Sequence, residues 1–123
     1  MSTHAPITVT VKRRVPSQNM WNNKRGIMGS MVYKKERDVW FALLRAALRP
    51  KDKPMHLVQA KIISFRSSLL DFGNLVGGAK MIPDGLIKLG YLFDDAPAWF
   101  YCEYEQRKCP RNSECTIIHI KNP

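Results

Sequence analysis

Acidic side chains are scarce in this sequence: its 123 residues include ten Asp and Glu against twenty Lys and Arg. The net charge of +10 and the isoelectric point near 9.9 favour a polyanionic partner: DNA, RNA or an acidic membrane surface. The alternative is a basic surface that serves only solubility. The imbalance is largest from Lys12 to Arg66, where fourteen basic residues accompany only three acids, Glu36, Asp38 and Asp52.

Long apolar runs are also missing, and none reaches the roughly 18 residues of a membrane-spanning helix. The first residues, MSTHAPITVTVKRR, lack the charged region and the apolar region of a secretory signal. The three cysteines, Cys102, Cys109 and Cys115, have no CxxC spacing, so we expect reduced thiols in a cytoplasmic protein without a membrane partner. A zinc site made by Cys109, Cys115 and His119 would fit no usual ligand spacing.

Hydrophobic periodicity predicts four strands and two helices. The strands are expected at residues 7–12, 56–66, 99–106 and 115–120. The first helix is expected from an N-cap at Ser30 to about Arg49, and the second at about 79–89, with Pro83 in its first turn and Gly90 after its end.

This order, β-loop-α-β-α-β-β, predicts a single α/β (α+β) domain over residues 1–123. We expect a mixed sheet of about four strands with two helices packed on it. If the second and third strands are parallel, the helix between them forms a right-handed crossover.

Residues 13–30 are rich in Pro, Ser, Asn and Gly, which predicts a long loop. Long loops in small domains are usually functional or disordered. This one carries Trp21 and the cations Arg13, Arg14, Lys24 and Arg25, a composition suited to phosphates and exposed bases. A flexible, solvated loop is the alternative interpretation.

Two motifs in LLDFGNLVGGAK, residues 69–80, resemble nucleotide-binding signatures but fail on context. Asp71-Phe72-Gly73 matches the kinase D-F-G triplet, yet no H-R-D loop precedes it. The glycine run ends in Lys80, but Met81 stands where a phosphate-binding loop needs Ser or Thr. Neither a kinase nor a phosphate-binding loop is therefore expected, and the glycines are instead expected to shape a loop between the strand at 56–66 and the helix at about 79–89.

Carboxylates gather after this stretch, where Asp71, Asp84, Asp94 and Asp95 fall within 25 residues. Mg²⁺ is commonly held by one or two carboxylates, substrate phosphate and water. Asp71 and Asp95 would hold such an ion if both segments reach the same end of the sheet, and Lys80 could stabilise the phosphate charge. The alternatives are a turn at Asp94-Asp95 before Pro97, and a helix-dipole role for Asp84.

The pattern Asp71…Asn74-Leu75, Lys80, Asp84 and LGYLFDDAP resembles the RusA-type Holliday-junction endonucleases often carried by phages and prophages. The segment VPSQN, with Ser17 and Asn19, is similar to the Pro-Ser-x-Asn loop of that family. The similarity covers nearly the whole chain, and residues 71–97 are its specific part.

This resemblance implies a homodimer that binds four-way DNA junctions and hydrolyses their backbone with Mg²⁺, or with Mn²⁺ as a substitute, in DNA recombination and repair. The loop of residues 13–30 is expected to bind DNA through Arg13, Arg14, Ser17, Asn19, Lys24 and Arg25. The resemblance assigns the metal to Asp71, Asp95 and Asp94, catalysis to Asp71, Asp95 and Lys80, and supporting roles to Asn74 and Asp84.

One position departs from the family pattern, because Gly73 stands where a second metal-binding aspartate is expected. The neighbouring Phe72 is apolar where phage relatives are often acidic. A missing carboxylate weakens Mg²⁺ binding unless Asp84 or Asp94 substitutes. The chain could therefore be a weakened endonuclease or a non-catalytic junction-binding protein on the same scaffold. An unrelated RNA- or single-strand-binding domain is the third possibility.

Overall fold

Four strands form one mixed sheet in the order β1-β4-β2-β3. The computed structural model describes residues 5–24 and 26–123. Strand β4 is antiparallel to both β1 and β2, whereas β2 and β3 are parallel. The predicted fold class, a mixed α+β sheet of about four strands, is confirmed. The strands are β1 (Ile7–Val11), β2 (Val58–Arg66), β3 (Phe100–Lys108) and β4 (Cys115–Ile120).

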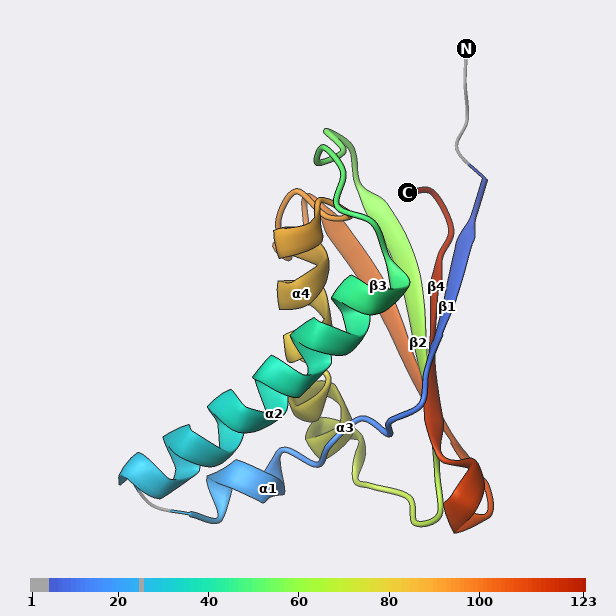
Figure 1. Cartoon of the computed structure of the whole chain (residues 1–123). Coiled ribbons are helices and arrows are strands. Elements are labelled where there is room, and N and C mark those ends of the chain that lie inside the picture. Colours follow the sequence, from blue (N-terminus) through green and yellow to red (C-terminus); the bar gives the residue numbers. More distant parts are fainter. Residues whose placement is uncertain (1–4, 25) are drawn as a thin grey trace.

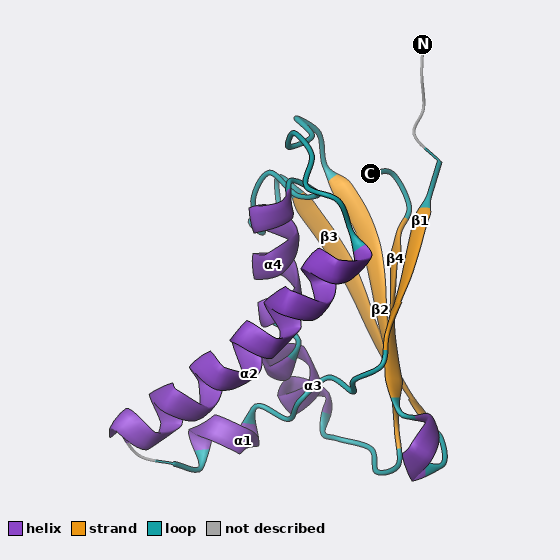
Figure 2. Cartoon of the chain, in the orientation of Figure 1, coloured by secondary structure: helices purple, strands orange, loops and turns teal. Residues whose placement is uncertain are grey.

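The main helices lie on one side of this sheet (Figures 1 and 2). They are α1 (Asn19–Asn22), α2 (Gly26–Ala47), α3 (Phe72–Gly78) and α4 (Met81–Leu89), and a short 3-10 helix, η1 (Arg111–Ser113), joins β3 to β4. Side chains of α2 and α4 meet the inner face of the sheet in the core, where Trp40, Leu44, Ile82, Leu86, Ile62 and Ile118 are buried.

The prediction of a loop over residues 13–30, with an N-cap at Ser30, is wrong. Helix α1 forms within that segment, and α2 already begins at Gly26. The ring of Trp21 packs edge-on against Tyr33 at 5.0 Å, which joins the two helices. A Cβ atom on Gly29 would lie 2.8 Å from the backbone oxygen of Trp21, so this glycine permits their close approach. Local composition does not reveal such a contact.

The glycine-rich segment after β2 was also predicted to be a loop, and it is the helix α3 instead. The N-terminal segment crosses this helix closely, since the backbone N–H of Gln18 donates to the Asn74 carbonyl at 3.1 Å. A Cβ atom on Gly78 would lie only 1.6 Å from the carbonyl oxygen of Pro16. The glycine therefore serves helix-to-loop packing, not phosphate binding.

Helix α4 agrees with the prediction. Pro83 is its third residue, where its missing N–H needs no partner. Gly90 ends the helix with φ of 90°, in the left-handed region that favours glycine. A Cβ atom on Gly85 would approach Leu44 to 2.6 Å, so α4 lies directly against α2.

Candidate functional site

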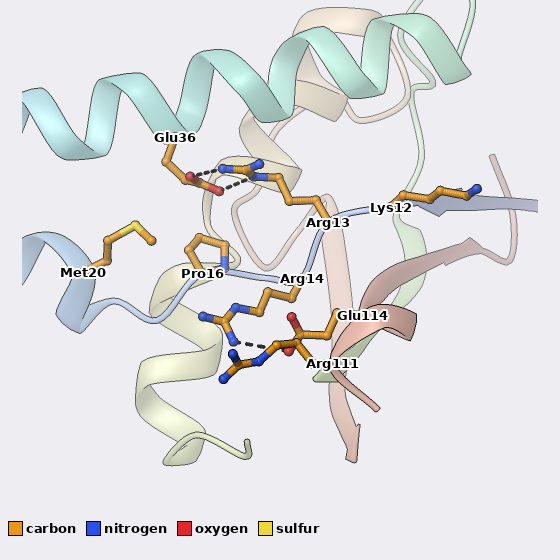
Figure 3. Close-up of a pocket in the computed structure, with 8 residues that line it drawn as sticks. All are labelled: Lys12, Arg13, Arg14, Pro16, Met20, Glu36, Arg111 and Glu114. Carbon is orange, nitrogen blue, oxygen red and sulfur yellow. Dashed lines mark hydrogen bonds and ion pairs between the residues drawn. The ribbon is translucent and has the colours of Figure 1, made fainter. Parts of the chain in front are cut away.

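A cleft of about 400 Å³ lies between the segment that follows β1, helix α2 and the turn before β4 (Figure 3). We call it the basic cleft, because four of its lining residues are cations. It is lined by Lys12, Arg13, Arg14, Pro16, Met20, Glu36, Arg111 and Glu114. Four cations and two carboxylates leave it a formal charge of +2.

Arg13 is neutralised inside this cleft. Its Nε and Nη2 atoms donate to the two carboxylate oxygens of Glu36 at 2.7 and 2.6 Å. This hydrogen-bonded ion pair raises the pKa of Arg13. Glu36 is buried in α2, so its carboxylate depends on the arginine for compensation. Arg13 therefore anchors the N-terminal segment to α2 and has little charge left for a ligand.

The charge of Arg14 is more available to an anionic ligand than that of Arg13, although Arg14 also contacts a carboxylate. Its Nη1 lies 3.2 Å from Glu114, and nearly half of its side chain is exposed. Glu114 accepts closer bonds from the backbone N–H of Ser67 at 2.7 Å and from the Ser67 hydroxyl at 2.9 Å. These bonds and the charge of Arg14 lower the pKa of Glu114. Glu114 would therefore keep its partners if Arg14 turned toward a phosphate.

Lys12 and Arg111 are exposed, and neither forms an ion pair among residues 5–24 and 26–123. Figure 3 shows the Arg111 and Arg14 side chains beside Glu114 in the same part of the cleft, whereas Lys12 extends away along β1. Arg111 and Arg14 thus supply the positive charge that a bound anion would meet.

A buried arginine fixes the segment that forms one wall of the cleft. Arg66, at the end of β2, is only 2% exposed. It donates to the backbone oxygen of Val15 and, at 2.8 Å, to that of Ser68. Burial lowers the pKa of Arg66, and the nearby charge of Arg14 lowers it further. No sequence motif predicted a role for Arg66, Arg111 or Glu114; the one available signal was the arginine that ends an apolar strand.

The other residues predicted to bind DNA are placed as follows. The Ser17 hydroxyl accepts a hydrogen bond from the Asn19 backbone N–H at 3.1 Å, which fixes the entry to α1. Asn19 and Lys24 are exposed at this corner. Arg25 lies outside the described residues.

Lys80 and Asp95 line one cavity of about 270 Å³ on the helix-covered side of β3. We call it the Lys80–Asp95 cavity. Lys80 sits between α3 and α4, and Asp95 lies in the segment that leads to β3. Its remaining walls are formed by Val76, Gly77, Pro83, Phe100 and Tyr104. Two of the predicted catalytic residues therefore face a common space.

Tyr104 contributes an uncharged hydroxyl to this cavity at neutral pH. Burial raises the pKa of the Tyr104 hydroxyl, and the Cys102 thiol and the Asp95 carboxylate raise it further. Burial also raises the pKa of Cys102 to about 11. Tyr104 therefore stays protonated and keeps a hydroxyl hydrogen that it can donate.

Asp71 does not line this cavity. It is exposed and precedes α3, after the carboxyl end of β2, whereas Asp95 precedes the amino end of β3. The two parallel strands therefore separate the backbone segments, so the expectation that both reach the same end of the sheet is wrong. Gln106, on the same face of β3 as Tyr104, bonds both backbone groups of Leu70 at 2.9 and 2.6 Å, which holds the segment before α3 against the carboxyl-terminal half of β3.

The other carboxylates are partly engaged locally. Asp94 accepts the backbone N–H of Asp95 at 2.9 Å, which supports the turn interpretation, and Asp84 is half-buried in the first turn of α4. The described ranges contain no group of three or more His, Cys, Asp or Glu placed to hold a metal ion. A site with one carboxylate completed by substrate phosphate and water still fits Asp95 beside Lys80.

The three cysteines carry free thiols. In the part of the chain that the structure describes, none of the helices has the length and apolar character needed to cross a membrane. Comparison with known proteins finds no family that matches this chain, and no curated protein matches it.

Proposed function

We propose that this protein is a Mg²⁺-dependent endodeoxyribonuclease that binds four-way DNA junctions as a homodimer. The observation that carries the proposal is the shared cavity of Lys80 and Asp95, a cation and a carboxylate brought together from separate segments. The resemblance of residues 71–97 to RusA-type endonucleases supports the same reaction, as does the net charge of +10.

In this proposal Asp95 would hold the metal together with a phosphate of the substrate and water. Mg²⁺ held there would supply polarisation of the phosphoryl oxygen and a more acidic water. Lys80 neutralises charge that develops on the phosphate, and the protonated Tyr104 donates a hydrogen bond beside it. Asp71, adjacent to the Leu70 that Gln106 holds on β3, does not line the cavity.

The basic cleft would hold the DNA backbone at a distance from the scissile bond. Arg111 and Arg14 contact phosphates, since Arg guanidinium groups bind phosphate oxygens in bidentate geometry. Contacts of this kind position the duplex without reading its sequence. The proposed substrate is therefore recognised mainly by its shape and charge.

The test is cleavage of an end-labelled four-way junction with Mg²⁺ or Mn²⁺. We expect cutting by the native chain and a loss of roughly 100-fold or more in Asp95→Asn and in Lys80→Met. Asp52→Asn, an exposed carboxylate in the loop before β2, is the matched control and should cut normally. Cutting that Asp95→Asn retains in full would refute the assignment.

A second candidate is a protein that binds junctions and does not cut them. Two observations favour it: Gly73 replaces an expected carboxylate, and no group of three potential metal ligands occurs in the described residues. Tight, salt-sensitive junction binding without cleavage would establish this candidate. A preference for single-stranded nucleic acid over junctions would exclude both candidates.

A further inference from the structure

The corner formed by α1 and α2 exposes several large apolar side chains. Ile27, Met28 and Met31 are 77%, 64% and 62% exposed in the first turns of α2, and Met20 on α1 is 41% exposed. We call these four residues the apolar tip. Ile27 and Met31 are one helical turn apart and so share a face. Figure 1 shows this half of α2 projecting beyond the sheet.

The apolar tip lies where α1 and α2 pack closely against each other. The edge-on packing of Trp21 on Tyr33 joins α1 to α2 on the inner side. Gly29, which is buried, allows the backbone oxygens of Trp21 and Lys24 to approach α2 so closely that a Cβ atom would meet them at 2.8 and 2.9 Å. These contacts hold the apolar side chains outward on a fixed support.

The charges around the tip identify the kind of partner. Residues 1–35 contain no Asp or Glu, and the exposed cations Lys24, Lys34 and Lys35 flank the apolar residues. Two copies that faced each other here would bring like charges together, whereas a polyanion would neutralise them. Met20 also lines the basic cleft, so the tip continues the surface that we assign to phosphates.

We propose that the apolar tip inserts against unpaired or weakly stacked bases of branched DNA. This inference rests on the proposed DNA binding and specifies what that surface recognises. Apolar side chains such as Met and Ile serve as wedges between base steps in several DNA-binding proteins, while flanking cations hold the phosphates. Unstacking is least costly where bases are already open, so the wedge favours a branch point over intact duplex.

The experiment compares the native chain with the triple variant Ile27→Ser, Met28→Ser, Met31→Ser. The probes are a four-way junction with 2-aminopurine at its branch point and a linear duplex of the same sequence. We expect the native chain to raise 2-aminopurine fluorescence and to prefer the junction. The triple variant should lose the fluorescence rise and roughly tenfold of junction affinity, with duplex affinity little changed, since each buried apolar side chain contributes modestly.

Met55→Ser with Leu57→Ser is the matched control, because these exposed apolar residues lie in the loop before β2. This double variant should behave like the native chain. Far-UV circular dichroism checks that all variants keep their helices, and Ile27→Ser alone provides a milder substitution if the triple variant loses helix.

Four results would overturn the inference, and each leads to a different conclusion. A triple variant that keeps both the fluorescence rise and the junction preference shows that the tip does not insert. If light scattering shows that the triple variant turns a dimer into a monomer while junction preference persists, the tip is a contact between copies. Equal binding of junction and duplex by the native chain refutes insertion alone, whereas failure to bind any DNA refutes the proposed function as well.

Discussion

Replacement of Arg111 by Ala should reduce the salt dependence of DNA binding, because the variant makes about one phosphate contact fewer than the native chain. Arg111 is exposed in the basic cleft and has no ion-pair partner within the described residues, so its full charge is available. Each phosphate neutralised on duplex DNA contributes roughly −0.9 to the slope of log K against log salt concentration.

The magnitude follows directly. Raising the salt from about 50 to about 200 mM should reduce the affinity of the native chain by roughly 3.5-fold for each phosphate contact. The Arg111→Ala variant should therefore lose roughly 3.5-fold less affinity over this range than the native chain, or roughly twelvefold less if both clefts of a dimer bind one DNA. Fluorescence anisotropy of a labelled duplex in a salt titration measures both slopes.

The matched control is the double variant Arg13→Gln with Glu36→Gln. It removes a bidentate ion pair from the same cleft without changing the net charge, and the two amides can still hydrogen-bond. Its slope should equal that of the native chain, because the charge of Arg13 is already compensated. An unchanged slope in Arg111→Ala, or an equal decrease of the slope in the double variant, would refute the reasoning that Arg111 carries a free charge and Arg13 a compensated one.

Three further predictions concern activity and stability. Gly73→Asp should increase Mg²⁺-dependent junction cleavage, since a side chain there meets nothing within 4 Å and supplies the carboxylate that the family pattern expects; no gain would show that more than one ligand is missing. Gly78→Ala should destabilise the fold by about 2 kcal/mol in urea unfolding, because its Cβ would lie 1.6 Å from the Pro16 oxygen, whereas Gly73→Ala in the same helix should be neutral or stabilising. The folded-state pKa of Glu114 is lowered, so its stabilisation should be complete above about pH 5 and lost as the pH falls through that pKa. Thermal melts from pH 6 to 3 should accordingly show a smaller acid-induced decrease in Tm for Glu114→Gln, and an equal decrease would contradict this role.

Local patterns were sufficient where an element lies half-buried on the sheet or ends in a residue with special backbone geometry. Strand β4 coincides with the predicted residues 115–120, because alternate side chains face the core along its length. Gly90 marked the end of α4, since its left-handed conformation is a local property. The α+β class and the mixed sheet followed from the order of such elements.

Prediction from local patterns failed where contacts with a distant segment decide the local conformation. Glycines normally weaken a helix, so residues 72–78 looked like a loop. The closeness of the Pro16 backbone makes Gly78 necessary, and α3 forms under that crossing segment. For the same reason α1 and the start of α2 were missed, because Gly29 and Trp21 stabilise that corner through contacts between helices.

The sequence by itself determined the basic character of the protein, its strands and the residue types available for phosphate chemistry, since these depend on composition and short-range periodicity. Only the tertiary structure decided which of those residues act together. Pairing with the buried Glu36 removes Arg13 from the free charges, while the turn before β4 brings Arg111 beside Arg14. The parallel pairing of β2 and β3 directs Asp71 and Asp95 to opposite strand ends and leaves Lys80 facing Asp95 alone. The sequence specifies the charge and chemical type of each side chain, whereas tertiary packing sets the distances between them.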